Sequence, residues 1–279
     1  MGRGERALCI LCGGEKTRPY QSVEGPSQVV QCTSCDLVFV HPQPSSDTLT
    51  AHYDGAYYAE WVGSQAAARE KLWRRRLRAV TAVRNRGDLL DVGCGDGGFL
   101  RAAQREGFTV SGTEISPFAA ERVRHLCIPL YQGPLEEASF PPGSFDIVTL
   151  WHVLEHMSDP LRALRKAHTL LRDQGVLFVA VPNLENTPAQ LLYRMVKGHP
   201  LPLYTPEGKE PHLYHFTPTT LTLLLGKAGF TPERIGPDLA QVTWEHRLVE
   251  ILSVLISATF RKRLYDSLLV RAAKRGATP

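Results

Sequence analysis

The sequence has no long hydrophobic run, no secretory leader pattern and no strong excess of charge. No apolar stretch reaches the roughly 18 residues that a membrane-spanning helix needs, and the first ten residues, MGRGERALCI, lack the apolar core of a signal peptide. The net charge is only +4, whereas nucleic-acid-binding domains usually carry a larger, clustered basic excess. These absences argue against a membrane-spanning, secreted or nucleic-acid-binding protein and predict a cytoplasmic one.

Internal repeats and low-complexity tracts are also absent from the sequence. The 279 residues, 43% apolar and 22% charged, are enough for one ordinary α/β domain with a small appended module. Changes in pattern along the chain predict a module at 1–45 and a helical linker that covers the cofactor at 46–86. The main domain is predicted at 87–279, with a proline-rich lid at 183–214.

Cysteine is rare outside the N-terminal module. Cys9, Cys12, Cys32 and Cys35 form two C-x-x-C pairs separated by 19 residues, a spacing typical of a four-cysteine zinc site. Four thiolates satisfy tetrahedral Zn²⁺ and leave no position for a substrate. We therefore predict a zinc-ribbon-like module with a structural ion. A redox dithiol is disfavoured because neither pair opens a helix in a thioredoxin-like context.

From residue 88 to 182, apolar runs of strand length alternate with segments of helical periodicity. This rhythm predicts right-handed βαβ crossovers and a parallel sheet covered on both faces. Ser116 with Pro117, and Thr217 with Pro218, are expected to begin helices. A helix is expected over 158–175, a basic helix over 66–83 with its arginines in solvent, an apolar helix over 246–263, and final strands at 230–236 and 267–275.

The stretch LLDVGCGDGGFL, residues 89–100, combines a strand, a glycine-rich turn and a helix start. Gly93, Gly95 and Gly98 satisfy the G-x-G-x-x-G spacing of dinucleotide-binding folds. Asp91, however, would repel a pyrophosphate and attract the ammonium of an amino-acid moiety. Glu114, at the end of the next strand, can accept hydrogen bonds from ribose hydroxyls. The two acids favour S-adenosylmethionine over NAD.

With LLDVGCGDGGFL, the segments VSGTEISP, SFDIVTLWHVLEHMSDP and LLRDQGVLFVAVPN resemble the successive motifs of class I S-adenosylmethionine-dependent methyltransferases over residues 86–274. The resemblance implies a seven-stranded, mostly parallel sheet of order 3-2-1-4-5-7-6 with the last strand antiparallel. It also implies a set of cofactor-binding residues: Asp91, Gly93, Cys94, Gly95, Gly97, Glu114, Ile115, Leu135, Glu136, Trp151 and His152.

The string WHVLEH supplies the candidates for catalysis. His152 and His156 flank Glu155 in an H-x-x-E-H pattern, which also occurs in a class of zinc proteases. Here the string follows an apolar strand and a proline soon follows it, so a coincidental match is the better interpretation. We expect His152 or His156 to help remove a proton from the acceptor; the alternative is that they fix the loop. His212, Tyr214 and His215 lie near the predicted return of the lid, where similar segments of related methyltransferases lie over the acceptor pocket.

The N-terminal cysteine pairs together with HYDGAYY are similar to a bacterial subgroup that includes sugar C-methyltransferases. A small-molecule acceptor, sugar or lipid-linked, is therefore expected. The alternatives are an RNA methyltransferase that uses the module and the arginines at 74–76, an NAD-dependent oxidoreductase, and a non-catalytic zinc-ribbon protein. The stretch 248–263, apolar and then basic, is interpreted as a peripheral membrane contact, a packed helix or a dimer contact.

Overall fold

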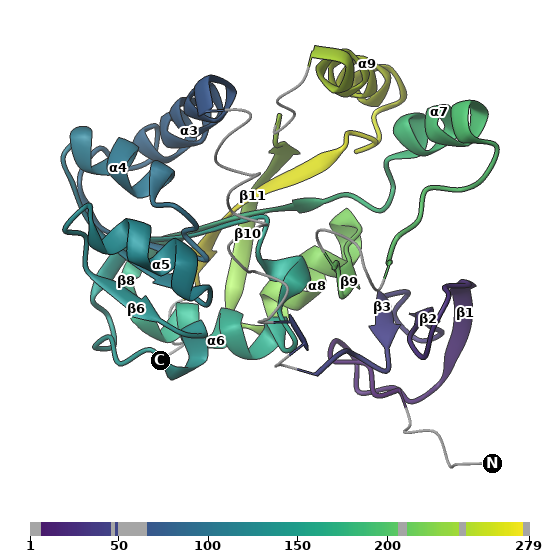
Figure 1. Ribbon diagram of the computed structural model, residues 1–279, viewed down its shortest axis with the longest axis horizontal. Helices are drawn as coiled ribbons and strands as arrows, with labels where there is room; N and C mark the ends of the chain where they lie inside the picture. The colour runs from purple at the N-terminus through teal and green to yellow at the C-terminus, as the bar shows by residue number, and fades with distance from the viewer. Residues whose placement is uncertain (1–6, 46–47, 50–65, 206–210, 240–243, 276–279) are drawn as a thin grey trace.

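A computed structural model describes residues 7–45, 48–49, 66–205, 211–239 and 244–275 (Figure 1). Its main sheet has seven strands in the order β10-β11-β8-β7-β4-β5-β6. The strands are β4 (Gly87–Val92), β5 (Phe108–Glu114), β6 (Leu130–Gln132), β7 (Phe145–Trp151), β8 (Leu171–Pro182), β10 (Phe230–Pro237) and β11 (Ser267–Lys274). Numbered in chain order within this sheet, the order is 3-2-1-4-5-7-6. The last strand, β11, runs antiparallel to both neighbours, so the predicted topology is confirmed.

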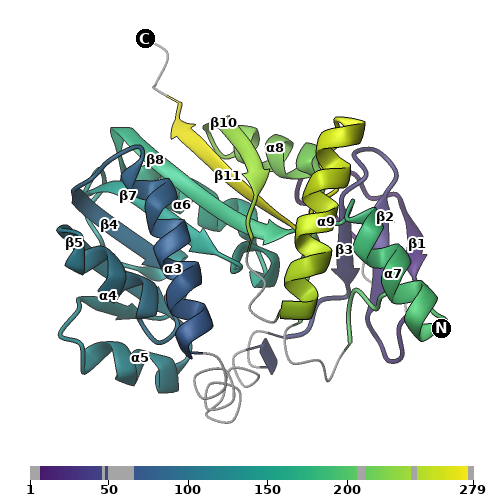
Figure 2. The same cartoon turned by 90° about the horizontal axis from the view of Figure 1, so that it is seen from above.

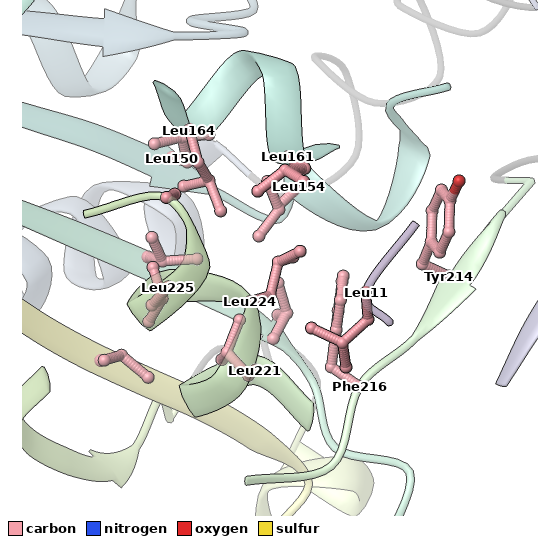
Figure 3. Close-up of a cluster of buried hydrophobic side chains, with 14 of the residues drawn as sticks. Leu11, Leu150, Leu154, Leu161, Leu164, Tyr214, Phe216, Leu221, Leu224 and Leu225 are labelled. Atoms are coloured by element: carbon pink, nitrogen blue, oxygen red, sulfur yellow. The ribbon is translucent and has the colours of Figure 1, made fainter. Parts of the chain in front are cut away.

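Helices cover both faces of this sheet, as predicted. One face carries α3 (Ala66–Thr81), α4 (Gly98–Arg105) and α5 (Pro117–Arg124), and the other carries α6 (Pro160–Leu170) and α8 (Pro218–Lys227). Alternation along the strands separates the two cores: Leu89 packs with α3 and α4, whereas Leu90 packs with α6 and α8. Figure 3 shows Leu161 and Leu164 of α6 facing the leucines of α8.

Helix starts follow the sequence signals closely. The Ser116 side chain accepts a hydrogen bond from the Ala119 amide and precedes a proline, while Thr217 forms a capping box with Thr220. The end of α6 differs from the prediction: the helix stops at Leu170, and Leu171 already pairs with Phe145 of β7. Strand pairing there overrides the helical periodicity that extends to residue 175.

A second sheet has four strands in the order β1-β2-β3-β9. Its strands are β1 (Thr17–Gln21), β2 (Gln28–Cys32), β3 (Val38–His41) and the short β9 (Tyr214–His215). The last strand therefore comes from the far end of the predicted lid and pairs with the N-terminal module. Lys227 of α8 donates to the carbonyls of Ile10 and Leu11, and Leu11 joins the core beside Phe216 (Figure 3). The module thus packs continuously against the main domain.

Two helices, α7 (Thr187–Lys197) and α9 (Trp244–Phe260), lie side by side at one end of the molecule (Figures 1 and 2). α9 has an unusual distribution of residues, since Ser253 and Ser257 are buried while Leu252 and Leu255 are 53% and 60% exposed. On α7, Met195 is 74% exposed. In the described part of the chain, no helix is long and apolar enough to cross a membrane. Much of the predicted linker at 46–86 lies outside the described residues.

Candidate active site

The glycine-rich turn lies between β4 and α4, at the carboxyl edge of the sheet. Gly93 has φ +64°, and a Cβ there would lie 2.7 Å from the side chain of Val153. Gly97 also adopts the left-handed conformation, φ +75°, at the N-cap of α4. Only glycine fits both the backbone conformation and the close approach at Gly93. The turn therefore presents bare backbone at the strand ends, where ligands of open α/β sheets bind.

The two predicted acids come together at this turn, and both are buried. Asp91 accepts a 2.6 Å hydrogen bond from the Thr149 hydroxyl, and burial raises the pKa of its carboxyl group to about 7. Glu114 accepts hydrogen bonds from the amides of Gly95 at 2.9 Å and Ser116 at 2.8 Å. The second acid therefore fixes the glycine turn and the start of α5 together.

The remaining residues predicted to bind the cofactor follow the neighbouring strands. Cys94 is buried in the turn, and Ile115 is half-buried directly after β5. Leu135 and Glu136 belong to η1 (Leu135–Glu137), the short 3-10 helix after β6; Leu135 is buried, and burial raises the pKa of Glu136. Trp151, at the end of β7, packs edge-on against Phe99 with ring centroids 5.2 Å apart.

A buried polar network that the sequence did not reveal lies beside Trp151. The Arg76 guanidinium lies 2.6 Å from the Asp238 carboxylate and stacks 4.9 Å from the Trp151 ring centroid. His152 adopts φ +56° and places Nε2 3.1 Å from the same carboxylate. The expectation that the arginines of α3 face solvent is wrong for Arg76, which is 3% exposed. Its partner follows β10, 162 residues later, so no local pattern could identify the pair.

His152 also approaches Glu155, with 3.4 Å between Nδ1 and the carboxylate. Burial alone would lower the pKa of His152, but Asp238 and Glu155 outweigh it and raise that pKa to about 9. The contact with His152 holds the pKa of Glu155 at about 2. The Arg76 guanidinium, together with His152, holds the pKa of Asp238 well below its usual value, in both cases against burial. At neutral pH His152 thus has no lone pair to accept a proton. This charge state disfavours the predicted role of His152 as a general base.

His156 has a different environment at the end of η2 (Leu154–His156), the 3-10 turn after β7. Its Nδ1 lies 3.0 Å from the Pro211 carbonyl, which can only accept, so Nδ1 carries a hydrogen and, in the neutral ring, Nε2 carries the lone pair. Nε2 points toward Glu155, 4.0 Å from the carboxylate. The His212 ring lies 4.8 Å from the His156 ring. The H-x-x-E-H string is therefore a short turn, not the long helix of a zinc protease.

The segment that carries His212 is fixed by backbone hydrogen bonds on both sides. The Leu213 amide donates to the Glu155 carbonyl at 2.8 Å, and the Val40 amide donates to the Leu213 carbonyl at 2.9 Å. His215 is buried on β9, and burial lowers its pKa to about 3, so the ring is neutral. The N-terminal sheet thus holds one wall of the site through β9.

The four cysteines of the module meet, as their spacing indicates. All four sulfur atoms lie within 4.8 Å of one another, with Cys9 and Cys35, and Cys12 and Cys32, 3.5 Å apart. Tetrahedral zinc with bonds of about 2.3 Å places sulfur atoms about 3.8 Å apart. Burial opposes ionisation of Cys32, but amides of Ser34 and Cys35 outweigh it and lower its pKa to about 7. The donor set and geometry fit a four-coordinate ion.

Comparison with known proteins agrees with this geometry. A family model described as "Methyltransferase domain" matches residues 64–235. A ubiquinone biosynthesis O-methyltransferase from Xanthomonas campestris pv. campestris (strain B100) is 31% identical over 57% of this chain and 68% of the relative. A similar protein of that name from Xanthomonas euvesicatoria pv. vesicatoria (strain 85-10) is 29% identical over the same shares.

Solved structures show the same fold. A magnesium protoporphyrin IX methyltransferase from Synechocystis PCC 6803 with bound SAH superposes with a TM-score of 0.58 at 14% identity, covering 82% of this chain and all of that one. A SAM-dependent methyltransferase from Archaeoglobus fulgidus gives 0.55 at 19% identity, covering 78% of this chain and all of that one. The family match, the strand order and the glycine turn at the carboxyl edge agree. This chain belongs to the methyltransferase-domain family and is a class I S-adenosylmethionine-dependent methyltransferase.

Proposed function

We propose that this methyltransferase transfers the methyl group to an oxygen of a small-molecule acceptor bound where β4 and β7 end. One observation carries the proposal: the glycine turn with its two buried acids shares this edge of the sheet with the His152–Glu155–His156 cluster. The glycine turn with its acids suits a cationic nucleoside. The histidine–glutamate cluster lies where an acceptor would approach that nucleoside. Relatives with about 30% identity are named as O-methyltransferases, which supports oxygen as the attacked atom.

On the methyl-donor side, Asp91 would hold the amino group and Glu114 the ribose hydroxyls. The cradle fits such a ligand because Gly93 approaches its neighbours too closely for any side chain, and Asp91 is a buried acid without a basic hydrogen-bond partner in the described residues. The adenine ring of the methyl donor would be flanked by half-buried Ile115 and Glu136 and by buried Leu135. Bound S-adenosylmethionine supplies a methyl group already activated by its sulfonium. The protein's task is therefore mainly alignment.

On the acceptor side, His152 would act as a fixed cation that keeps Glu155 and Asp238 in place. His156 would present Nε2, with a lone pair in the neutral ring, toward Glu155 beside the expected acceptor position. That lone pair can accept a proton or coordinate a cation, and the neighbouring side chains decide between these uses. An RNA acceptor is disfavoured: of the three arginines at 74–76, Arg76 is buried against Asp238 and Arg75 donates to the Leu239 carbonyl.

The cysteine cluster would bind a structural Zn²⁺ ion. Because β3 pairs with β9, an ion there would stabilise the sheet that positions His212. The module is thus expected to support the acceptor wall indirectly, since four thiolate ligands leave the ion no open position.

The exposed face of α7 and α9 would rest on an anionic membrane surface. Apolar side chains point outward from both helices, and basic residues border them: Arg194, Lys197, Arg261, Lys262 and Arg263, all exposed. A groove of about 880 Å³ beside them is lined by Val254, Ala258 and the basic residues at 261–263. Apolar area with flanking positive charge matches a lipid headgroup boundary. The same surface would suit a lipid-linked acceptor.

Calorimetry with S-adenosylmethionine and with NAD tests the methyl-donor site. We expect binding of S-adenosylmethionine alone, and a roughly hundredfold weaker Kd in Glu114→Gln, because hydrogen bonds to a charged group contribute about 1.5–3 kcal/mol each. Glu121→Gln, at an exposed acid on α5, is the matched control. NAD binding, or equal affinity in both variants, would contradict the assignment. A panel of hydroxylated acceptors, assayed for S-adenosylhomocysteine release, then tests whether the methyl group is transferred to an oxygen atom.

A further inference from the structure

Three side chains with metal-binding atoms converge outside the cysteine module. Glu155 and His156 come from the turn after β7, and His212 comes from the segment that leads into β9. A carboxylate oxygen and one nitrogen of each imidazole all lie within 4.8 Å of one another. The cluster lies at the carboxyl edge of the sheet, where the acceptor is expected.

The Glu155 carboxylate is the most informative member of this cluster. Its side chain is 1% exposed, and neither oxygen has a hydrogen-bond partner among the described residues. The approach of His152 Nδ1 at 3.4 Å gives an ion pair to one oxygen only. Buried charged groups are normally both paired and hydrogen-bonded. This carboxylate therefore has the capacity to bind a further cation.

His156 is oriented in the way that metal-ligating histidines usually are. Its Nδ1–H donates to the Pro211 carbonyl, which fixes the ring and directs the Nε2 lone pair toward Glu155 at 4.0 Å. In metal sites the ring nitrogen that does not bind the ion commonly makes this kind of contact with a backbone carbonyl. In the neutral ring, the Nε2 lone pair and the Glu155 carboxylate oxygen are both electron-rich, so a cation between them would stabilise their approach.

The scaffold holds the third ligand close to the other two. The Leu213 amide donates to the Glu155 carbonyl at 2.8 Å, so His212 is tied directly to the turn that carries Glu155. Ligand atoms around a bound ion lie about 3.0–3.5 Å apart, depending on the coordination geometry, because the bonds are about 2.0–2.2 Å long. The present spread of up to 4.8 Å would have to contract by more than an ångström when the ion binds.

We propose that Glu155, His156 and His212 bind a divalent transition-metal ion, separate from the ion of the four cysteines. Two imidazoles and one carboxylate suit Zn²⁺, Fe²⁺, Co²⁺ or Ni²⁺ better than Mg²⁺ or Ca²⁺, which prefer oxygen ligands. Three protein ligands leave coordination positions open, as in catalytic metal sites. His156 is then a ligand and not the general base that its sequence position indicates.

The role of the ion rests on the function proposed above. An acceptor hydroxyl that coordinates it loses its proton to water more easily, since a bound cation lowers the pKa of an oxygen ligand. The resulting oxyanion attacks the methyl carbon, the carbon–sulfur bond breaks, and its electron pair stays on sulfur as a thioether. The site would thus select acceptors with an ionisable hydroxyl, above all those with a second oxygen able to chelate.

Cobalt binding to the whole chain, in the absence of a methyl donor, tests this site. With the cysteine site first saturated with Zn²⁺, Co²⁺ is titrated and followed by calorimetry and by its weak visible bands. Cobalt bound by thiolates would be recognised separately by its intense sulfur charge-transfer band. We expect one equivalent of Co²⁺ in the unmodified protein. Binding should be at least about tenfold weaker in Glu155→Gln and His212→Ala, the loss that even outer-shell changes produce. It should be unchanged in His125→Ala, at the exposed histidine that follows α5.

Parallel calorimetry with S-adenosylmethionine separates this proposal from the proposed function. A protein that binds the methyl donor but takes up no Co²⁺ beyond its cysteine site would overturn the metal site and leave the methyltransferase assignment intact. Equal Co²⁺ affinity in all variants would also overturn it. If Glu155→Gln does not fold, judged by circular dichroism, His212→Ala decides the question alone, because His212 is partly exposed.

Discussion

The two halves of the site are built differently. The methyl-donor half, from Asp91 to Glu114, comes from one continuous strand–turn–helix–strand unit. The acceptor half brings together Arg76 of α3, Glu155 of the turn after β7, His212 before β9 and Asp238 after β10. The first half depends on local backbone geometry, whereas the second depends on packing between distant elements. Substitutions in elements that are distant in sequence but pack against the site should therefore affect the acceptor half more than the methyl-donor half.

The largest effect is expected from Cys32→Ser, which removes one ligand of the predicted zinc ion. Binding of structural zinc to small modules contributes on the order of 10 kcal/mol. We expect loss of one equivalent of zinc by metal analysis and faster amide hydrogen exchange in β3 and β9, with β4 unchanged. Cys127→Ser, at an exposed lone cysteine, is the control. An equal loss of hydrogen-exchange protection in β4 would show that the methyl-donor half depends on the zinc module as much as the acceptor half does.

Asp238→Asn should have the next largest effect, because it leaves the Arg76 guanidinium buried without its counter-charge. Breaking one side of a buried ion pair costs about 3–5 kcal/mol, equivalent to a fall in Tm of about 10 °C for a domain of this size. Thermal unfolding measures this change. The control is Asp173→Asn, whose carboxylate is 99% exposed. An unchanged Tm would contradict the network that anchors the acceptor half.

The pH dependence of methyl-donor binding should depend on Asp91 and not on the acceptor half. Its raised pKa of about 7 means that the cation-binding, ionised form is lost as the pH falls below 7. Affinity for S-adenosylmethionine should then fall by up to about tenfold per pH unit. Calorimetry between pH 5 and 8 tests this. In Asp91→Asn the slope should disappear, and a slope that persists there would refute the assignment.

The same shift has a defined consequence for the stability of the free protein. The pKa of Asp91 in the folded protein lies above its usual value of 3.8. The contribution of Asp91 to the free energy of unfolding is therefore fully present below pH 3.8 and is lost as the pH rises through 7. His152, with a pKa of about 9, and Glu155, with a pKa of about 2, keep their charges over this range. The His152–Glu155 ion pair should therefore keep its charges over the range in which Asp91 titrates.

The smallest effect is expected at the exposed face of α7 and α9. We expect weak, salt-sensitive sedimentation with anionic vesicles, since each basic residue contributes only about 1 kcal/mol at such a surface. Leu252→Asp should abolish it, while Leu223→Asp, at an exposed leucine of α8 (49%), should not. Absence of binding, or a dimer in sedimentation analysis that Leu252→Asp dissociates, would contradict the membrane contact.

Sequence patterns predicted most of the fold because they are local. Strand and helix periodicity, with the caps at Ser116 and Thr217, marked the alternating units, and the family motifs implied the strand order that the structure confirms. The errors occurred where tertiary contacts override local preference. Strand pairing ended α6 five residues before the predicted position. α9 formed close to its predicted range, and the structure added its orientation, which the sequence had left open, with leucines outward and serines inward.

By itself, the sequence determined the glycine turn, the acids Asp91 and Glu114 beside it, and the meeting of the four cysteines, because short spacings and strand ends constrain these residues directly. Only the tertiary structure decided that Arg76 is buried against Asp238, that His152 holds a proton, and that His212 reaches Glu155. Those contacts join residues separated by as many as 162 positions. They depend on how helices and sheets pack, which residue spacing along the chain does not encode.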